Sequence, residues 1–173
     1  MRIIDLGCGA WKKIPGSTGL DIVKGSCTDI QWDMDKMPWP IPDGSYDLAV
    51  CNEAVEHLAD IRGFLNETRR ILDVNGILVL TTNNEDSLIN AVFHTYRFKG
   101  HKSLQNTGSL KHYVSQYFHI LSFFMLPYDR QPQPDLRVRN DLRFMLTVLP
   151  RRILHSLLPE FLQERMVVVA MKY

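Results

Sequence analysis

The chain has 173 residues, of which 45% are hydrophobic and 23% charged, and its formal net charge at pH 7 is +1. This length and composition are typical of one globular domain and exclude a disordered or low-complexity chain. The longest apolar stretch, near residues 118–126, is too short to span a bilayer. The three cysteines have neither a disulfide framework nor the spacing of zinc ligands. We therefore expect one cytoplasmic domain with reduced thiols, residues 1–173.

The small net charge conceals an uneven distribution of charged residues. Residues 1–90 contain 8 Lys and Arg against 14 Asp and Glu, whereas residues 91–173 contain 12 against 5. A basic second half favours an anionic acceptor or partner, with Arg151 and Arg152 as a candidate anion clamp. The alternative is that these residues solvate helices whose apolar faces pack on a sheet, and the sequence leaves both interpretations open.

The first apolar segment runs straight into a glycine turn. Residues 3–6 read as a strand, Gly7-Cys8-Gly9 follows it, and a second short strand carries Asp21 twelve residues after Gly9. Glycines let the backbone approach a ligand closely, and an acid at the tip of the neighbouring parallel strand can accept both hydrogen bonds of a ribose diol. The pair predicts a nucleotide cofactor.

Strand and helix patterns alternate along the chain, which predicts a doubly wound α/β sheet. The expected strands are residues 3–6, 19–23, 30–33, 46–51, 77–81 and 166–171, with a further candidate at 118–125. Asp60 is the expected N-cap of a helix that Asn75-Gly76 would end. The buried face of that helix is expected to contain Ile61, Leu65, Thr68 and Leu72. Two further helices are expected near residues 86–96 and 142–158.

Six short motifs follow one another in the first half of the chain. They are Asp5-Leu6-Gly7-Cys8-Gly9, Gly19-Leu20-Asp21, Asp33, Ser45-Tyr46-Asp47-Leu48, Glu56-His57-Leu58 and Gly76-Ile77-Leu78-Val79-Leu80. In this order they resemble the motifs of class I S-adenosylmethionine-dependent methyltransferases over residues 2–84. The resemblance implies a single Rossmann-like methyltransferase domain whose sheet is mostly parallel with an antiparallel last strand. Its expected parts are a cofactor-binding half at 2–84, an acceptor-pocket or lid region at 85–164 and the last strand at 165–172.

The resemblance implies S-adenosylmethionine as the cofactor and S-adenosylhomocysteine as its product. Gly7 and Gly9 would form the turn under the methionine and ribose. Asp5 would orient that turn or accept a hydrogen bond from the methionine ammonium, and Asp21 would hold the ribose hydroxyls. Asn52 ends the fourth strand, where open α/β sheets bind ligands.

The adenine end of the cofactor would be held by residues that follow the second and third strands. Asp33 would accept a hydrogen bond from the adenine amine, and Asp35 is its rival for that role. Met34 would supply a backbone N–H and an apolar wall, and Ile22 would pack on the ring.

The segment Glu53-Ala54-Val55-Glu56-His57 has three interpretations. The acids could complement the dipole of a first helical turn while His57 packs beneath them. His57 could instead be the general base for the acceptor, since histidine ordinarily titrates near neutral pH. The third is a divalent metal site, because the spacing resembles that of methyltransferases that modify the 2′-hydroxyl of small RNAs; His112 would be the extra ligand. We assign Glu53, Glu56 and His57 to catalysis and no residue to a metal.

The chain departs from the family pattern between the first two strands. Residues 10–20 are too few for the usual connecting helix, and Trp11 replaces an expected third glycine. No helix precedes the first strand, so we expect the segment after the fifth strand, a second copy or a partner subunit to complete the acceptor site.

The sequence therefore predicts a methyltransferase that acts on an oxygen or nitrogen nucleophile of an acceptor, small or macromolecular, which the basic second half suggests is anionic. Two alternatives remain at this point. One is a non-catalytic, methyltransferase-like binding subunit, which Trp11 and the short crossover favour. The other is a nicotinamide dinucleotide enzyme, which the missing third glycine disfavours.

Overall fold

The computed structural model describes residues 1–85, 100–103, 105–126 and 165–173. Their seven strands form one sheet in the order β3-β2-β1-β4-β5-β7-β6. The strands are β1 (Ile3–Leu6), β2 (Thr18–Asp21), β3 (Ile30–Gln31), β4 (Tyr46–Asn52), β5 (Leu72–Asn83), β6 (His119–Leu126) and β7 (Arg165–Met171). The chain order of the strands reverses between β1 and β4, and this switch point is where open α/β sheets bind ligands.

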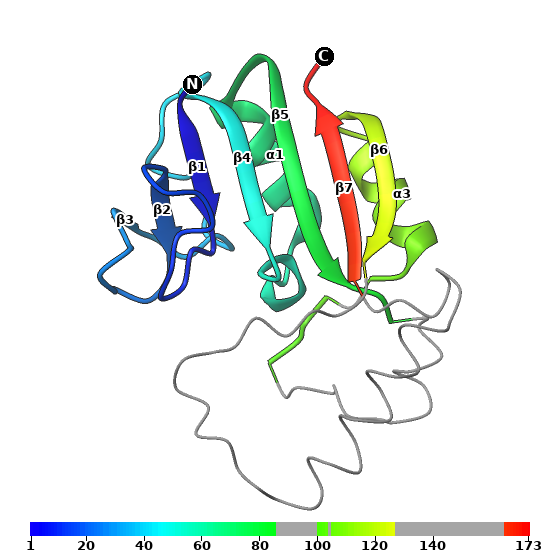
Figure 1. Ribbon diagram of the computed structural model, residues 1–173, viewed down its shortest axis with the longest axis horizontal. Helices are drawn as coiled ribbons and strands as arrows, with labels where there is room; N and C mark the ends of the chain where they lie inside the picture. Colours follow the sequence, from blue (N-terminus) through cyan, green and yellow to red (C-terminus); the bar gives the residue numbers. More distant parts are fainter. Residues whose placement is uncertain (86–99, 104, 127–164) are drawn as a thin grey trace, which may run out of the picture.

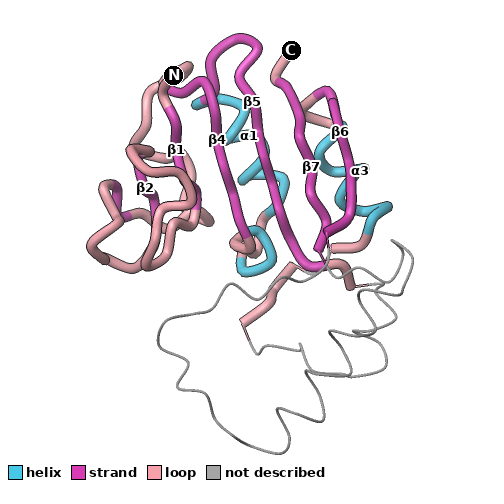
Figure 2. The backbone as a smooth tube through the Cα atoms, in the orientation of Figure 1, coloured by secondary structure: helices cyan, strands magenta, loops and turns pink. Residues whose placement is uncertain are grey.

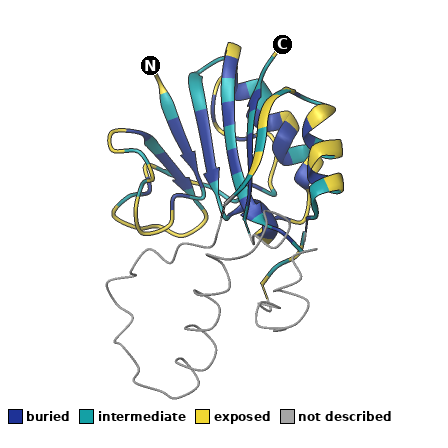
Figure 3. Cartoon of the chain, turned by 45° about the vertical axis from the view of Figure 1, so that its right-hand side comes forward, coloured by how far each residue is buried: buried dark blue, intermediate teal, exposed yellow. Residues whose placement is uncertain are grey.

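The sheet is mixed in the way the sequence predicts. β1 to β5 pair in parallel, whereas β7 lies antiparallel between β5 and β6. The two faces of the central strands differ in burial: Ala49, Cys51, Leu78 and Leu80 are fully buried, whereas Ile77 and Val79 on the other face of β5 are half-buried. Figure 3 shows this burial concentrated along the central strands. The predicted antiparallel last strand and the mostly parallel Rossmann-like sheet are confirmed.

Helix α1 (Ile61–Ile71) begins where Asp60 predicts. The Asp60 carboxylate accepts a hydrogen bond from the N–H of Gly63, which satisfies an otherwise unpaired donor of the first turn. The helix ends four residues earlier than expected. Leu72 still donates its N–H to the carbonyl of Thr68, but its backbone is extended and pairs with Tyr46 in the sheet. Asn75 adopts a positive φ of 60°. Asn75-Gly76 is therefore a turn within β5 and not the end of the helix.

Helix α3 (Thr107–Ser115) was not expected from the sequence. Asn106 accepts a hydrogen bond from the N–H of Ser109, and the Ser109 hydroxyl accepts one from the N–H of Asn106, which completes a capping box. Leu110 and Val114 are its buried residues, so its apolar face is too narrow for periodicity to show it. In Figure 1, α1 and α3 lie on the same side of the sheet.

The connection between β1 and β2 contains no helix, as its length predicts, and Figure 2 draws it as loop. β2 begins at Thr18 and ends at Asp21, and β3 has two residues, so both strands are shorter than expected. An added Cβ at Gly19 would lie 2.1 Å from the carbonyl oxygen of Cys27. The loop after β2 therefore folds back onto the strand, which keeps both strands short.

The helices expected near 86–96 and 142–158, and most of the region 85–164, lie outside the described residues. Arg151 and Arg152 lie there too. Among the described residues, no helix is long and apolar enough to cross a membrane.

Candidate functional site: the carboxyl edge of the parallel strands

The glycine turn after β1 is built for close approach. Gly7 and Gly9 have positive φ values of 75° and 59°, which side-chain-bearing residues rarely adopt. An added Cβ at Gly7 would lie 2.4 Å from the Cβ of Ala54, so the turn packs directly against the end of β4. At Gly9 an added Cβ would meet no atom of the described residues within 4 Å. Gly7 therefore serves packing, whereas Gly9 faces open space.

Asp21 is bonded to this turn. Its carboxylate accepts a hydrogen bond from the N–H of Gly9 at 2.9 Å and another from the N–H of Val23 at 2.9 Å. The first bond brings the tip of β2 against the glycine turn, as the sequence predicts for a ribose-binding acid. Beyond it, Ile22 is 59% exposed and Val23 68% exposed, and Trp11 on the preceding loop is 49% exposed. The apolar groups beside Asp21 are thus available to a flat ligand.

Asp5 lies beneath the turn and is 1% exposed. One carboxylate oxygen accepts a hydrogen bond from the backbone N–H of Lys13, and the other has no hydrogen-bond partner among the described residues. Burial raises the pKa of Asp5, and the Lys13 N–H partly opposes this shift. Through Lys13, Asp5 anchors the loop that follows the glycine turn.

The two acids that compete for the adenine have different surroundings. Asp35 accepts hydrogen bonds from the N–H groups of Ala59 and Asp60 and forms an ion pair with Lys102 at 3.4 Å. Asp33 accepts from the N–H of Asp35 and lies 3.8 Å from Lys36. Asp35 thus fixes the loop before α1, which supports Asp33 as the cofactor candidate.

Met34 and Asn52 are more deeply integrated into the fold than the sequence suggests. Met34 is 7% exposed, and its terminal methyl would lie 3.6 Å from a Cβ added at Gly7. Its carbonyl accepts a hydrogen bond from the indole N–H of Trp39. The side-chain oxygen of Asn52 accepts from the hydroxyl of Thr81 at 2.9 Å, which joins the ends of β4 and β5.

The segment that follows β4 in the chain forms the 3₁₀ turn η1 (Val55–His57), where the sequence predicts the start of a helix near Ala54. Glu53 has a positive φ of 51° and forms an ion pair with Arg165 at 2.6 Å. Glu56 is 2% exposed and accepts hydrogen bonds from the side chains of Thr82 (3.1 Å) and Asn83 (3.2 Å). Burial raises the pKa of the Glu56 carboxyl. Its carboxylate is therefore held toward β5.

His57 is exposed, and its Nδ1 lies 3.2 Å from the carbonyl oxygen of Gly100. Its ring meets that of His101 edge to face, with centroids 4.9 Å apart. Donor atoms of Glu56, His57 and His101 lie within 4.8 Å of one another. Burial, and then the neighbouring His57, lower the pKa of His101.

The histidine that joins this group was missed from the sequence. His101 is 44 residues from His57 in the chain, and only the folding of residues 100–103 against η1 brings it there. His112, the expected candidate, lies on α3 and pairs with the side chain of Gln116. Of the expected catalytic trio, Glu56 and His57 gather with His101, whereas Glu53 is bound to Arg165.

Comparisons with known proteins agree with this architecture. A family model described as a methyltransferase domain matches residues 4–80. A search of curated proteins gave no match. The matched residues contain all six sequence motifs, so the family model and the resemblance to class I S-adenosylmethionine-dependent methyltransferases agree over the first half of the chain.

Three solved structures illustrate the shared fold. An S-adenosylmethionine-dependent methyltransferase from Mesorhizobium loti is 17% identical, with a TM-score of 0.65 and coverage of 99% of this chain and 90% of that one. One from Archaeoglobus fulgidus is 19% identical, with a TM-score of 0.66 and coverage of 99% and 86%. A methyltransferase in complex with the Trm112 activator of Haloferax volcanii is 16% identical, with a TM-score of 0.66 and coverage of 99% and 82%. At these identities the likeness shows a shared fold.

Proposed function

We propose that the protein binds S-adenosylmethionine at the carboxyl edge of β1, β2 and β3 and transfers its methyl group to an oxygen or nitrogen of an acceptor. The observation that carries this proposal is the hydrogen bond from Gly9 to Asp21. It holds an acid at the tip of β2 against a glycine turn whose Gly9 faces open space. That is the arrangement a ribose and its neighbouring chain atoms require.

The electrostatics of this edge suit a cationic cofactor. S-adenosylmethionine carries a sulfonium and an ammonium, and Asp5 and Asp21 place two carboxyl groups beside the turn. Asp5 has one buried oxygen without a hydrogen-bond partner among the described residues, which suits it to accept from the ammonium directly or through water. Asp33 and the exposed Ile22 are our candidates for the adenine end.

In methyl transfer, the main contribution of the protein would be to position the acceptor against the methyl group. The sulfonium makes the methyl electrophilic, so the carbon–sulfur bond breaks as the bond from acceptor oxygen or nitrogen to carbon forms. The acceptor must be held in line with the carbon–sulfur bond and must lose its proton to a base. Glu56 and His57, at the end of β4, are our candidates for the acceptor end of the site, and Glu53 supports them through its bond to Arg165.

The acceptor class is proposed from charge. The second half of the chain is basic, which favours an anionic acceptor. Three of its lysines are described: Lys102 pairs with Asp35, Lys111 lies over the ring of Phe123 at 4.2 Å, and Lys172 donates to the carbonyl of Leu72. A partner chain or second copy that covers the acceptor side is also proposed, by analogy with the similar methyltransferase in complex with its activator.

Calorimetry with S-adenosylmethionine and S-adenosylhomocysteine tests the proposal. We expect both to bind, and Asp21→Ala to weaken them about 10- to 100-fold, because hydrogen bonds to a charged acceptor contribute about 1.5 to 3 kcal/mol. Asp43→Ala is the matched control, since Asp43 pairs with Arg70 at the opposite edge of the sheet.

The outcomes separate the alternatives. If the folded wild-type protein binds neither compound, the chain is a non-catalytic relative. If Asp21→Ala and Asp43→Ala bind both as the wild type does, Asp21 is not part of the cofactor site.

A further inference from the structure

Three potential metal ligands meet beside the end of β4. A carboxylate oxygen of Glu56 and ring nitrogens of His57 and His101 lie within 4.8 Å of one another. Ligands around one ion, each about 2.0 to 2.2 Å from it, lie roughly 3 to 4 Å apart. The three donor atoms are close to that spacing, and His57, the exposed member, is the side chain that can adjust to an ion.

The surroundings of each group orient it as a metal ligand needs to be oriented. The contact between His57 Nδ1 and the carbonyl of Gly100 assigns the ring proton to Nδ1 and leaves Nε2 as the lone-pair donor. Histidines that bind metals nearly always donate their other N–H to such a carbonyl or carboxylate. Thr82 and Asn83 orient the Glu56 carboxylate in the same way.

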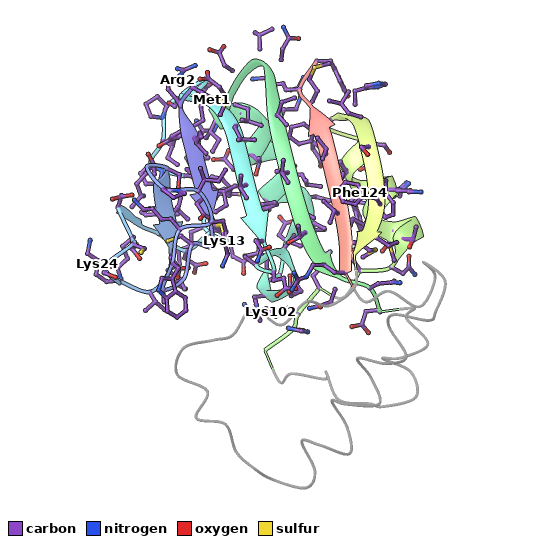
Figure 4. All side chains as sticks on the ribbon, in the orientation of Figure 1. Met1, Arg2, Lys13, Lys24, Lys102 and Phe124 are labelled. Carbon is purple, nitrogen blue, oxygen red and sulfur yellow. The ribbon has the colours of Figure 1, made fainter. Side chains whose placement is uncertain are left out.

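The backbone brings the third ligand into place. The N–H groups of Lys102 and Ser103 both donate to the carbonyl oxygen of Glu56, at 2.8 and 3.0 Å. His101 therefore sits between two contacts to η1, one from Gly100 and one from Lys102. Figure 4 shows Lys102 at this edge of the sheet. The three ligands are preorganised by one short turn and the segment that crosses it.

The charge of the cluster also favours a cation. Among the described residues, the side chains that donate hydrogen bonds to the buried carboxylate of Glu56 are the neutral ones of Thr82 and Asn83. Neutral donors stabilise a buried charge less than a cation does. A divalent ion would supply the positive charge at the point where two imidazole nitrogens face the same oxygen. Simple packing of two histidine rings does not explain why a buried carboxylate lies beside them.

We propose that Glu56, His57 and His101 bind one divalent transition-metal ion. Two imidazoles and one carboxylate favour an ion such as Zn²⁺ or Fe²⁺ over Mg²⁺ or Ca²⁺. Three protein ligands leave coordination positions open, as in catalytic sites. An acceptor oxygen bound at an open position would lose its proton more readily. That catalytic role rests on the proposed methyl transfer, whereas metal binding does not.

Titration of the metal-free full-length protein with Co²⁺ tests the site without any activity assay. The wild type is expected to develop visible ligand-field absorption at one equivalent. His57→Ala and His101→Ala should weaken Co²⁺ binding about 100-fold or more, and Thr82→Val about 10- to 100-fold, the usual effect of losing a group that orients a ligand. His112→Ala is the matched control, because it removes an imidazole on α3 that bonds Gln116, and it should bind Co²⁺ as the wild type does.

Two results would overturn the proposal: no visible absorption on adding Co²⁺ to the wild type, or equal Co²⁺ affinity in the wild type, His57→Ala and His101→Ala. S-adenosylhomocysteine affinity, measured on the same samples, reports the fold and the cofactor site separately. A protein that binds S-adenosylhomocysteine but not Co²⁺ refutes the metal site and leaves the methyltransferase proposal intact.

Discussion

The two edges of the sheet treat their charged residues differently. At the amino edge, charged side chains bind one another: Arg2 pairs with Asp47 and Asp73, and Arg70 pairs with Asp43 and Glu67. At the carboxyl edge Asp35 and Glu53 also have cations, Lys102 and Arg165, but three acids have none among the described residues: Asp5 and Asp21 accept hydrogen bonds from backbone N–H groups, and Glu56 accepts from neutral side chains. Figure 4 shows Arg2 at the first edge and Lys13 and Lys102 at the second.

We infer from this contrast that the paired acids of the amino edge stabilise the fold, whereas Asp5, Asp21 and Glu56 are candidates to bind a ligand. The amino-edge acids have their cations within the chain: Arg2 lowers the pKa of Asp47, and the N–H of Val74 and then Arg2 lower the pKa of Asp73. The carboxyl-edge acids Asp5 and Glu56 have raised pKa values because burial is not offset by a bonded cation. A cationic ligand at the carboxyl edge would provide that compensation.

The largest expected difference is between two alanine substitutions in the glycine turn, one at a packed position and one at an open position. Gly7→Ala should destabilise the protein by about 3 kcal/mol or more, because it adds a left-handed penalty to a clash with Ala54. Gly9→Ala meets open space and should cost about 1 to 2 kcal/mol from its positive φ alone. Its Cβ should nonetheless greatly weaken S-adenosylhomocysteine binding.

Urea denaturation and calorimetry on the two variants check this. Equal loss of stability in both would mean that Gly9 is also a packing residue. A Gly9→Ala protein that binds S-adenosylhomocysteine normally would place the ligand away from the turn.

Two buried acids should respond to amide substitution in opposite ways. Glu67 accepts from the Arg70 guanidinium and from the N–H of Trp39, and Arg70 chiefly lowers its pKa. Glu67→Gln should therefore cost about 1.5 to 3 kcal/mol at pH 7. The stability this acid contributes is fully present above the ordinary glutamate pKa of about 4.3 and is lost as the pH falls through the lowered value. The difference between wild type and variant should shrink accordingly in acid.

Asp5→Asn should change the free energy of unfolding least, and in the opposite direction to Glu67→Gln. Because burial raises the pKa of Asp5, its charge costs stability above that raised pKa, and the cost disappears as the pH falls toward the ordinary aspartate value of about 3.9. The asparagine variant should thus be as stable as the wild type or more so at pH 7, and lose that advantage in acid. Denaturation across this pH range measures both variants. If Asp5→Asn loses as much stability at pH 7 as Glu67→Gln does, the Asp5 carboxylate stabilises the fold in the way that the paired acids of the amino edge do.

The predictability of the fold follows from how local its signals are. The apolar runs of β1, β4 and β5 and the cap at Asp60 are local, and they identify the strands and the start of α1. The end of α1 depends on the pairing of Leu72 with Tyr46, which no local pattern contains. Helix α3 buries too few residues to produce a clear period.

The candidate site divides in the same way. Gly7, Gly9 and Asp21 lie near one another in sequence, so their spacing was enough to predict that they meet. His101 reaches His57 through backbone bonds made by Lys102 and Ser103, a contact across 44 residues that spacing could not indicate. The preference for Asp33 over Asp35 at the adenine comes from the sequence and stays a prediction, and the hydrogen bonds that Asp35 accepts from the loop before α1 are consistent with it.

A crystal structure with S-adenosylhomocysteine tests the central claim most directly. The account predicts the ligand along the carboxyl edge, with its ribose hydroxyls on Asp21, its amino-acid portion over Gly7 and Gly9, and its adenine beside Ile22 and Asp33. A ligand bound elsewhere on the protein, with the Gly9–Asp21 pair unoccupied, would contradict it.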